Sequence, residues 1–239
     1  MRHGICNLSV VPMRKEASHT SELVSELLFN DIYEIIDEND EWLNVKCMYD
    51  SYKGWIRKLQ HHEISDNEYD EFISSDKFIV NVPCIHYENM ILSFGSKVLN
   101  HVEGTVPLSK TFDANVLIES AFQMQHIPYR WGGKSIMGID CSAFVQLCAK
   151  VAGYKLPRDA SQQYNFGETI SELSEAQPGD IAFFKNKDHH IVHVGILLSK
   201  NIIIHASGEV RIDTIDENGI FNNKSNEYTH TLCKIKRLK

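Results

Sequence analysis

The sequence predicts an α+β protein in which one or two small β-barrels precede a domain of helices followed by antiparallel strands. Short apolar runs alternate with turn residues over residues 1–60. Helical spacing at 113–128 and 141–152 gives way to strand-like runs after residue 180. At 239 residues the chain is long for one compact core, so we expect domains at 1–60, 61–110 and 111–239.

The first sixty residues have the spacing of a small antiparallel barrel. Apolar runs of about 4–7 residues are separated by turns of hairpin length. The polar run Asp37–Asp40 suits a hairpin turn between two of them. The predicted strands are Ser9–Val11, Leu23–Phe29, Ile32–Ile36, Trp42–Lys46 and Gly54–Ile56.

Residues 61–110 predict a second, degenerate barrel that ends near Leu108. The acidic stretch Glu63–Asp76 indicates a solvated helix or a linker before it. Short strand-like runs follow at Phe78–Val80, Met90–Leu92, Lys97–Leu99 and Gly104–Val106.

The last part of the chain predicts two helices and then strands. Asp113 suits an N-cap, and apolar residues recur at helical spacing until Pro128. A second helix is expected from Cys141 to Ala152, with Gly153 as its stop. Its buried stripe would hold Phe144, Leu147, Cys148 and Val151. Strands are expected at Asp180–Phe184, His190–Leu198, Asn201–Ser207 and Cys233–Leu238.

Composition argues against several kinds of partner. The formal net charge is −8, and Lys and Arg are scattered, so nucleic acid is not an expected partner. No stretch approaches the ~20 apolar residues of a membrane span. The first residues lack an apolar run of secretory length. We therefore expect a cytoplasmic protein as the sequence is written, whereas a trimmed chain would equally fit the periplasm or envelope.

The six cysteines indicate neither a disulfide scaffold nor a structural zinc site, because no C-x-x-C pair is present. Most are expected to be small buried hydrophobes. A histidine-rich metal site is a weaker alternative, since the region around His193 supplies no Cys or carboxylate at ligand spacing. We expect neither a metal nor a cofactor.

Cys141, His193 and His205 form the main candidate site. Cys141 is expected in the first turn of its helix, where free backbone N–H groups and the helix dipole stabilise a thiolate. His193 and His205 fall on successive strands, so a hairpin would bring them together. His193 would be the base and His205 its orienting partner, and the alternative for each is a structural side chain. His189 and His190 are expected to face solvent.

Several motifs of this region, taken together, resemble the NlpC family of bacterial cysteine peptidases, papain-like enzymes that cut peptidoglycan peptides. The motifs are Pro128–Gly133, Asp140–Ser142, Leu156–Asp159 with Gln163, Pro178–Phe184, His193–Ile196 and Ile204–Ala206. The resemblance implies a papain-like domain with Cys141 as nucleophile, His193 as base and His205 as third residue. It also implies that the substrate cleft is lined by Tyr129, Asp140, Ser142 and Asp159. Two departures are Ala143, where the family often has Gly, and Ala160, where many members have Ser.

The N-terminal segment resembles a bacterial SH3-like domain at Arg14, Trp42, Val45, Gly54 and Trp55. Its fusion to an NlpC-type domain resembles the subgroup that hydrolyses the γ-D-glutamyl to diamino acid bond of free murein peptides. In that subgroup the barrel requires an unblocked N-terminal L-alanine. An ammonium is recognised by carboxylates and a phenol hydroxyl, so Tyr52 and Glu22 are the candidates from the barrel.

Two rival functions stay open at this level. A related cysteine amidase or acyltransferase would predict an apolar rim near Cys141, and the sequence has no strongly apolar loop there. A catalytically silent cell-wall binding protein would rely on its SH3-like modules. Joint retention of Cys141, His193 and His205 argues against the second rival.

Overall fold

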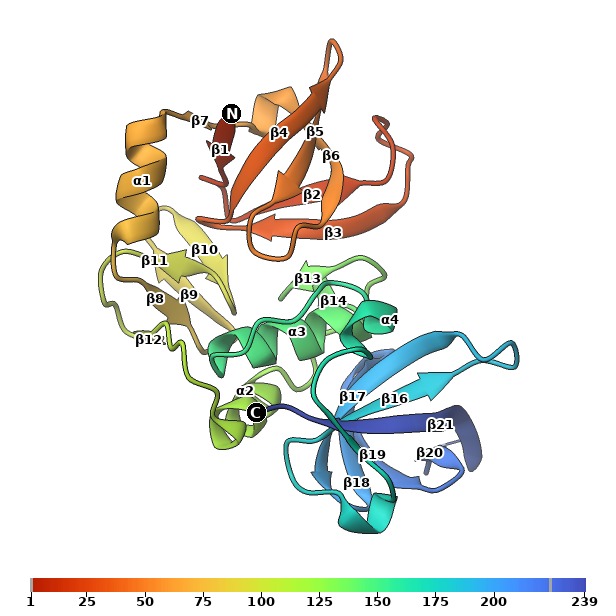
Figure 1. Ribbon diagram of the computed structural model, residues 1–239. Helices are drawn as coiled ribbons and strands as arrows, with labels where there is room; N and C mark the ends of the chain where they lie inside the picture. The colour runs from red at the N-terminus through yellow and green to blue at the C-terminus, as the bar shows by residue number, and fades with distance from the viewer. Residues whose placement is uncertain (1, 224) are drawn as a thin grey trace. The chain divides into compact units, whose positions relative to one another are not determined.

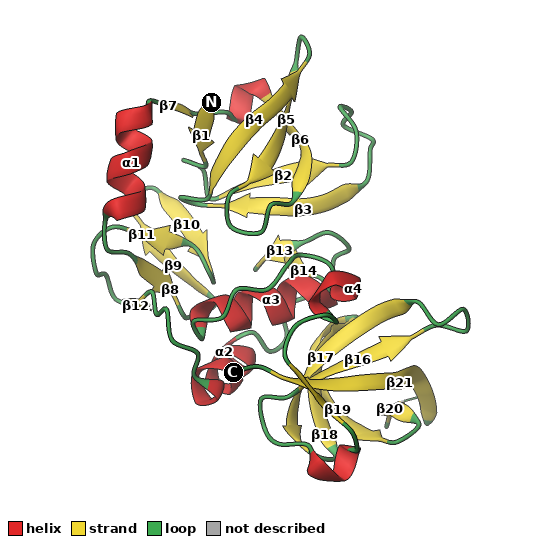
Figure 2. Cartoon of the chain, in the orientation of Figure 1, coloured by secondary structure: helices red, strands yellow, loops and turns green. Residues whose placement is uncertain are grey.

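The computed structural model describes residues 2–223 and 225–239 and divides the chain into two compact units. The first unit holds the residues up to Leu108 together with Arg130–Gly138, and the second holds Ser109–Tyr129 and Ile139–Lys239. Each unit is built mainly from antiparallel strands with a few short helices (Figure 1, Figure 2). Within the described residues, no helix has the length and apolar character needed to cross a bilayer.

The first unit begins with the predicted small barrel. Its antiparallel sheet has the strand order β3-β2-β6-β5-β4-β1-β7. Asn39 Oδ1 accepts hydrogen bonds from the backbone N–H groups of Glu41 and Trp42, which closes the turn between β4 and β5. The strands are β1 (His3–Ile5), β2 (Val10–Arg14), β3 (Leu23–Leu28), β4 (Ile32–Glu38), β5 (Trp42–Cys47), β6 (Lys53–Arg57) and β7 (Glu63–Ile64). Their core includes Val11, Met13, Leu27, Tyr33, Leu43, Val45 and Ile56.

The acidic stretch after the barrel is a helix, α1 (Asp66–Ser74), with a capping box between Ser65 and Glu68. Phe72 is its one buried residue, as a solvated helix requires. The strands that follow form two separate small sheets where a second barrel was expected. One has the order β11-β8-β12 and the other is a β9–β10 hairpin. Their bounds are β8 (Phe78–Val80), β9 (Cys84–Tyr87), β10 (Met90–Ser93), β11 (Lys97–Val98) and β12 (Thr105–Pro107).

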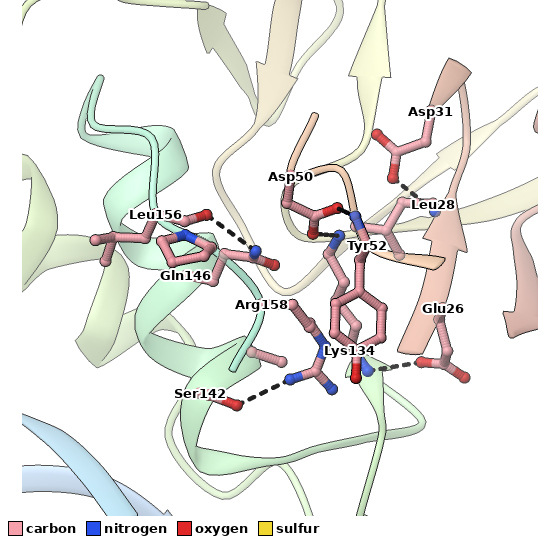
Figure 3. Close-up of polar contacts among 12 residues, drawn as sticks. Glu26, Leu28, Asp31, Asp50, Tyr52, Lys134, Ser142, Gln146, Leu156 and Arg158 are labelled. Carbon is pink, nitrogen blue, oxygen red and sulfur yellow. Dashed lines mark hydrogen bonds and ion pairs between the residues drawn. The ribbon is translucent and has the colours of Figure 1, made fainter. Parts of the chain in front are cut away.

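The segment Arg130–Gly138 packs with the first unit although it lies far from it in sequence. It contains β13 (Lys134–Ser135), which lies beside β3 and pairs with β14 (Gly138–Ile139). The buried Glu26 carboxylate accepts a hydrogen bond from the Arg130 guanidinium. It also accepts one from the Lys134 backbone N–H (Figure 3). Gly132 has φ +73°, and a Cβ there would lie 2.1 Å from the Leu23 carbonyl oxygen. Only glycine fits such a position.

The second unit confirms the predicted α+β class. Its sheet has the order β15-β21-β16-β17-β18-β19-β20, and a further pairing of β20 with β21 closes strands β16 to β21 into a barrel. The strands are β15 (Glu168–Ile170), β16 (Ile181–Lys185), β17 (Ile191–Ser199), β18 (Ile202–Ser207), β19 (Glu209–Asp216), β20 (Gly219–Asn222) and β21 (Glu227–Arg237). The core inside includes Ala182, Phe184, Leu197, Ile203, Ile215, Ile220 and Ile235.

The helices of this unit are α2 (Ala114–Gln123), α3 (Cys141–Val151) and α4 (Ala160–Gln163). Asp113 caps α2 as expected, because its side chain accepts from the Asn115 N–H at 2.8 Å. Gly153, with φ +84°, follows α3 as predicted. The predicted buried stripe on α3 was too narrow. All eleven residues of α3 are buried, since the helix contacts β17, β18, α2 and α4.

Candidate active site

The β17–β18 hairpin brings two imidazoles together. Gly195 pairs directly with His205 across the strands, and His193 lies two residues before Gly195, so both histidines project from the same face. His193 Nε2 lies 2.8 Å from His205 Nδ1. Both side chains are buried. The hydrogen bond fixes the orientation of His193 and leaves its Nδ1 as the nitrogen that does not face His205.

Cys141 lies beside the strand that carries His193. It is the first residue of α3, and α3 packs against β17. A backbone hydrogen bond joins the thiol to Val194, the residue that follows His193. The structure therefore places the nucleophile candidate at a helix N-terminus, hydrogen-bonded to the backbone of the residue that follows His193.

The thiol is more buried than its sequence context suggested. Burial, and then the negative charge of Asp140, raise the pKa of Cys141 to about 12. Backbone hydrogen bonds from Val194 and Ser142 and the charge of Arg158 act in the opposite direction but are outweighed. The expectation of a preformed thiolate was therefore wrong, because only 6 % of Cys141 is exposed. The thiol is protonated at neutral pH and needs a base.

The imidazole beside it suits that role. Burial lowers the pKa of His193 well below its usual value, and the charges of His230 and His205 lower it further. A neutral imidazole at neutral pH has a bare nitrogen that accepts a proton. His189 and His190 are exposed, as predicted.

A third histidine stacks on this pair, and sequence analysis missed it. The ring of His230, from β21, lies 4.0 Å from the ring of His193 at an interplanar angle of 26°. Phe184 packs near both rings. Burial lowers the pKa of His230 to about 4, so its ring is neutral at neutral pH. Exposed polar residues surround it in sequence, and their pattern gave no signal of a strand.

His205 is held in turn from β19. Its Nε2 lies 3.0 Å from Asp213 Oδ2, and the same oxygen accepts from Arg211 Nε at 2.8 Å and Nη2 at 2.6 Å. Burial opposes the charge of Asp213, but hydrogen bonds from His205 and Arg211 prevail and lower its pKa. Sequence analysis also missed this strand. Gly208 between two runs of alternating residues was the signal that could have revealed it.

Tyr129 is half-buried near the thiol. Burial, and then the negative charges of Cys141 and Asp140, raise its pKa to about 12. The phenol therefore stays protonated and able to donate at neutral pH. The Tyr129 backbone N–H donates to the Gly208 carbonyl at 2.8 Å, which ties the residue to the β18–β19 turn.

Asp140 and Ser142 form a buried network with Arg158. Asp140 Oδ1 accepts from Arg158 Nη1 at 2.9 Å and Oδ2 from Nη2 at 2.6 Å. Arg158 Nη1 also donates to Ser142 Oγ at 2.9 Å, and Figure 3 shows this contact. Asp140 is also the N-cap of α3, accepting from the Ala143 N–H at 2.8 Å. Both carboxylate oxygens of Asp140 thus position the helix that carries Cys141. Arg158 was not predicted from the sequence as a site residue.

Comparison with known proteins identifies the domains. Residues 125–228 match the NlpC/P60 family model, and residues 13–60 match the bacterial dipeptidyl-peptidase SH3 domain. The chain carries an NlpC/P60 domain. It is 24 % identical to gamma-D-glutamyl-L-lysine dipeptidyl-peptidase from Bacillus subtilis, covering 89 % of this chain and 80 % of the relative. It is 28 % identical to dipeptidyl-peptidase 6 from Lysinibacillus sphaericus, with 82 % and 86 % covered. Both of these relatives are named as dipeptidyl-peptidases.

A solved structure of an NlpC/P60 family protein from Bacillus cereus shares the fold. It aligns with a TM-score of 0.82 at 16 % identity, covering 98 % of this chain and 99 % of the other. Among residues 2–223 and 225–239, no group of three or more His, Cys, Asp or Glu side chains is arranged to hold a metal ion. All six cysteines lie in that part and are free thiols.

The remaining predicted substrate contacts lie in both units. Asp159 is the half-buried residue that precedes α4 of the NlpC/P60 domain. Tyr52 is half-buried between β5 and β6, and its N–H donates to Asp50. Glu22 accepts from Trp131 Nε1 at 2.7 Å, and this hydrogen bond and a second from a lysine lower its pKa. The substrate roles of these residues stay predictions.

Proposed function

We propose that the protein is a cysteine endopeptidase that hydrolyses the γ-D-glutamyl to L-diamino acid bond of murein peptides with a free N-terminal L-alanine. The diamino acid is diaminopimelate or lysine. One observation supports the proposal: Cys141 begins α3 and is hydrogen-bonded to the backbone of Val194, the neighbour of His193, which in turn pairs with His205. The names of the two relatives, a gamma-D-glutamyl-L-lysine dipeptidyl-peptidase and a dipeptidyl-peptidase, support this substrate. A dipeptidyl-peptidase releases a dipeptide from a free amino terminus.

The reaction begins with transfer of the Cys141 proton to His193 Nδ1, since Nε2 is engaged by His205. The thiolate attacks the γ-carbonyl carbon, a C–S bond forms, and the carbonyl π electrons move to oxygen. The Cys141 backbone N–H at the start of α3 and the Tyr129 hydroxyl are the donors for this oxyanion. The raised pKa of Tyr129 keeps that hydroxyl protonated.

The intermediate then collapses. The C–N bond breaks, and His193 gives its proton to the departing amine of the diamino acid. His193 next takes a proton from water as the water oxygen attacks the thioester carbonyl carbon. The C–S bond then breaks, which releases the dipeptide acid and the Cys141 thiolate. Proton return to the sulfur restores Cys141. Burial keeps the resting thiol and imidazole neutral, so the charged pair forms during attack on a bound substrate.

Substrate contacts follow from the network around α3. Asp140 is already paired with Arg158, so we assign it, with Ser142, to shaping the cleft wall. Asp159 is assigned to the substrate ammonium, because a carboxylate is the natural partner of that group. Tyr52 and Glu22 are retained as contacts contributed by the SH3 domain.

The test uses two substrates and two variants. We expect L-Ala-γ-D-Glu-diaminopimelate to be split into L-Ala-D-Glu and diaminopimelate, and its N-acetylated form to survive. Cys141→Ala should abolish cleavage and retain binding, whereas Cys84→Ala, which removes an exposed thiol, should cleave normally. Cleavage by Cys141→Ala would refute the nucleophile. Equal rates on the two substrates would refute the need for a free amine.

A further inference from the structure

The hydrogen bond between His193 and His205 continues to a third side chain, Asp213. The number of protons available to these three side chains limits which nitrogens can carry them. His193 Nε2 meets His205 Nδ1 at 2.8 Å, and His205 Nε2 meets Asp213 Oδ2 at 3.0 Å. Each contact needs one proton between its two heavy atoms. A neutral imidazole carries a single N–H. Burial keeps both imidazoles neutral by lowering their pKa values.

The charge of Asp213 decides where those protons lie. An ionised carboxylate only accepts, so His205 must donate from Nε2. His205 Nδ1 is then bare and accepts from His193 Nε2. The single proton of His193 is thereby held on Nε2. Its Nδ1, the nitrogen assigned to accept the Cys141 proton, then carries no hydrogen.

We propose that Asp213 is a positioning residue that sets the tautomers of both histidines and so makes His193 a base. This role rests on the proposed function, because it matters only if Cys141 is the nucleophile. The opposite tautomers would put a hydrogen on His193 Nδ1, and the imidazole would then have no free lone pair for the thiol proton. A second-sphere acceptor is a general device for orienting a functional histidine.

Arg211 is the second residue that holds the Asp213 carboxylate in place. It lies directly opposite His205 across the β18–β19 ladder and contributes two N–H groups to the same oxygen of Asp213. The guanidinium has no acceptor, so any side chain at position 213 must present an oxygen to it. It also offsets the carboxylate charge, so the Asp213–Arg211 pair directs hydrogen bonds without adding net charge beside His205.

This arrangement predicts different outcomes for two substitutions. Asp213→Asn should present its amide oxygen to Arg211 and His205, and so keep the tautomers and most of the activity. Asp213→Ala removes the acceptor, so both histidines should become tautomer mixtures, and kcat/KM should fall about 100-fold, as when a reacting group is misplaced. Asp216→Ala, three residues along β19 and bonded to Tyr228, is the matched control and should match the parent.

The experiment measures histidine ring ¹⁵N shifts and kcat/KM on the tripeptide for the full chain and these variants. The expected resting state has His193 and His205 both protonated on Nε2. Protonation of His205 on Nδ1, or unchanged tautomers and rate in Asp213→Ala, would overturn the proposal. The ring nitrogens report on the tautomers even if the parent does not cleave the tripeptide. An inactive parent with Nε2-protonated rings would reject the proposed function while confirming that Asp213 sets the two tautomers.

Discussion

The Asp140–Arg158 pair provides a quantitative test of how the nucleophile helix is held. Only 1 % of the Arg158 side chain and 9 % of the Asp140 side chain are exposed. Removing one partner of a buried ion pair costs about 3–5 kcal/mol, because the other charge is left without compensation. Asp140→Ala also removes the N-cap of α3, a loss of roughly 1 kcal/mol that overlaps with the first. We expect a total loss of about 3–5 kcal/mol in the free energy of unfolding.

The assay combines urea denaturation with hydrogen exchange of peptides that cover α3. Asp113→Ala is the matched control, since it removes an exposed N-cap with one backbone hydrogen bond and should cost about 1 kcal/mol. A double variant, Asp140→Ser with Arg158→Met, keeps a capping oxygen and removes the buried cation, so it should recover most of the loss. A cost for Asp140→Ala no greater than that of Asp113→Ala would refute the structural role of this carboxylate.

The remaining predictions concern the histidine site. Because the pKa values of His193 and His205 are lowered on folding, the unfolded chain binds more protons below pH ~6.5. The contribution of the two neutral imidazoles to the free energy of unfolding is complete above that pH. It is lost as the pH falls, by up to about 1.4 kcal/mol per pH unit for each imidazole. A urea midpoint that stays constant from pH 7.5 to 5.5 would contradict this. His230→Phe should retain the stack on His193 and keep kcat within about threefold. His230→Ala should lower kcat about tenfold, which corresponds roughly to the energy of one aromatic pair. Equal kcat values for His230→Ala and the parent would rule out a role for the ring. Gly195→Ala places a methyl 2.8 Å from both His205 Cβ and Ile203 Cδ1, so it should cost about 1–3 kcal/mol of stability, and an unchanged denaturation curve would disprove that crowding.

Local signals in the sequence were sufficient for much of the fold. The cap at Asp113, the stop at Gly153 and the turn around Asn39 each depend on residues a few positions apart. Cys141 and the two histidines were also within reach, because a helix start and a hairpin define their positions. These features depend on backbone chemistry that neighbouring residues reveal.

The rest depended on contacts between distant residues. Arg158 reaches Asp140 from eighteen positions away, and His230 reaches His193 from another strand of the barrel. Asp213 lies on a strand in which polar and apolar residues are mixed and only Val210, Asp213 and Ile215 are buried, so the strand contains no apolar run that a search could find. The thiol pKa likewise follows from the depth of burial, which sequence spacing does not encode.

The packing of Arg130–Gly138 against β3 limits where this protein can be divided to exchange its N-terminal barrel for another. A cut after residue 108 would leave this loop with the peptidase half while removing Glu26 and Leu23, the groups that hold it. The buried backbone N–H of Lys134 would lose its acceptor, and Gly132 would lose the close approach that explains it. Replacing the barrel by a foreign one therefore requires replacing the loop Arg130–Gly138 with its matching loop as well.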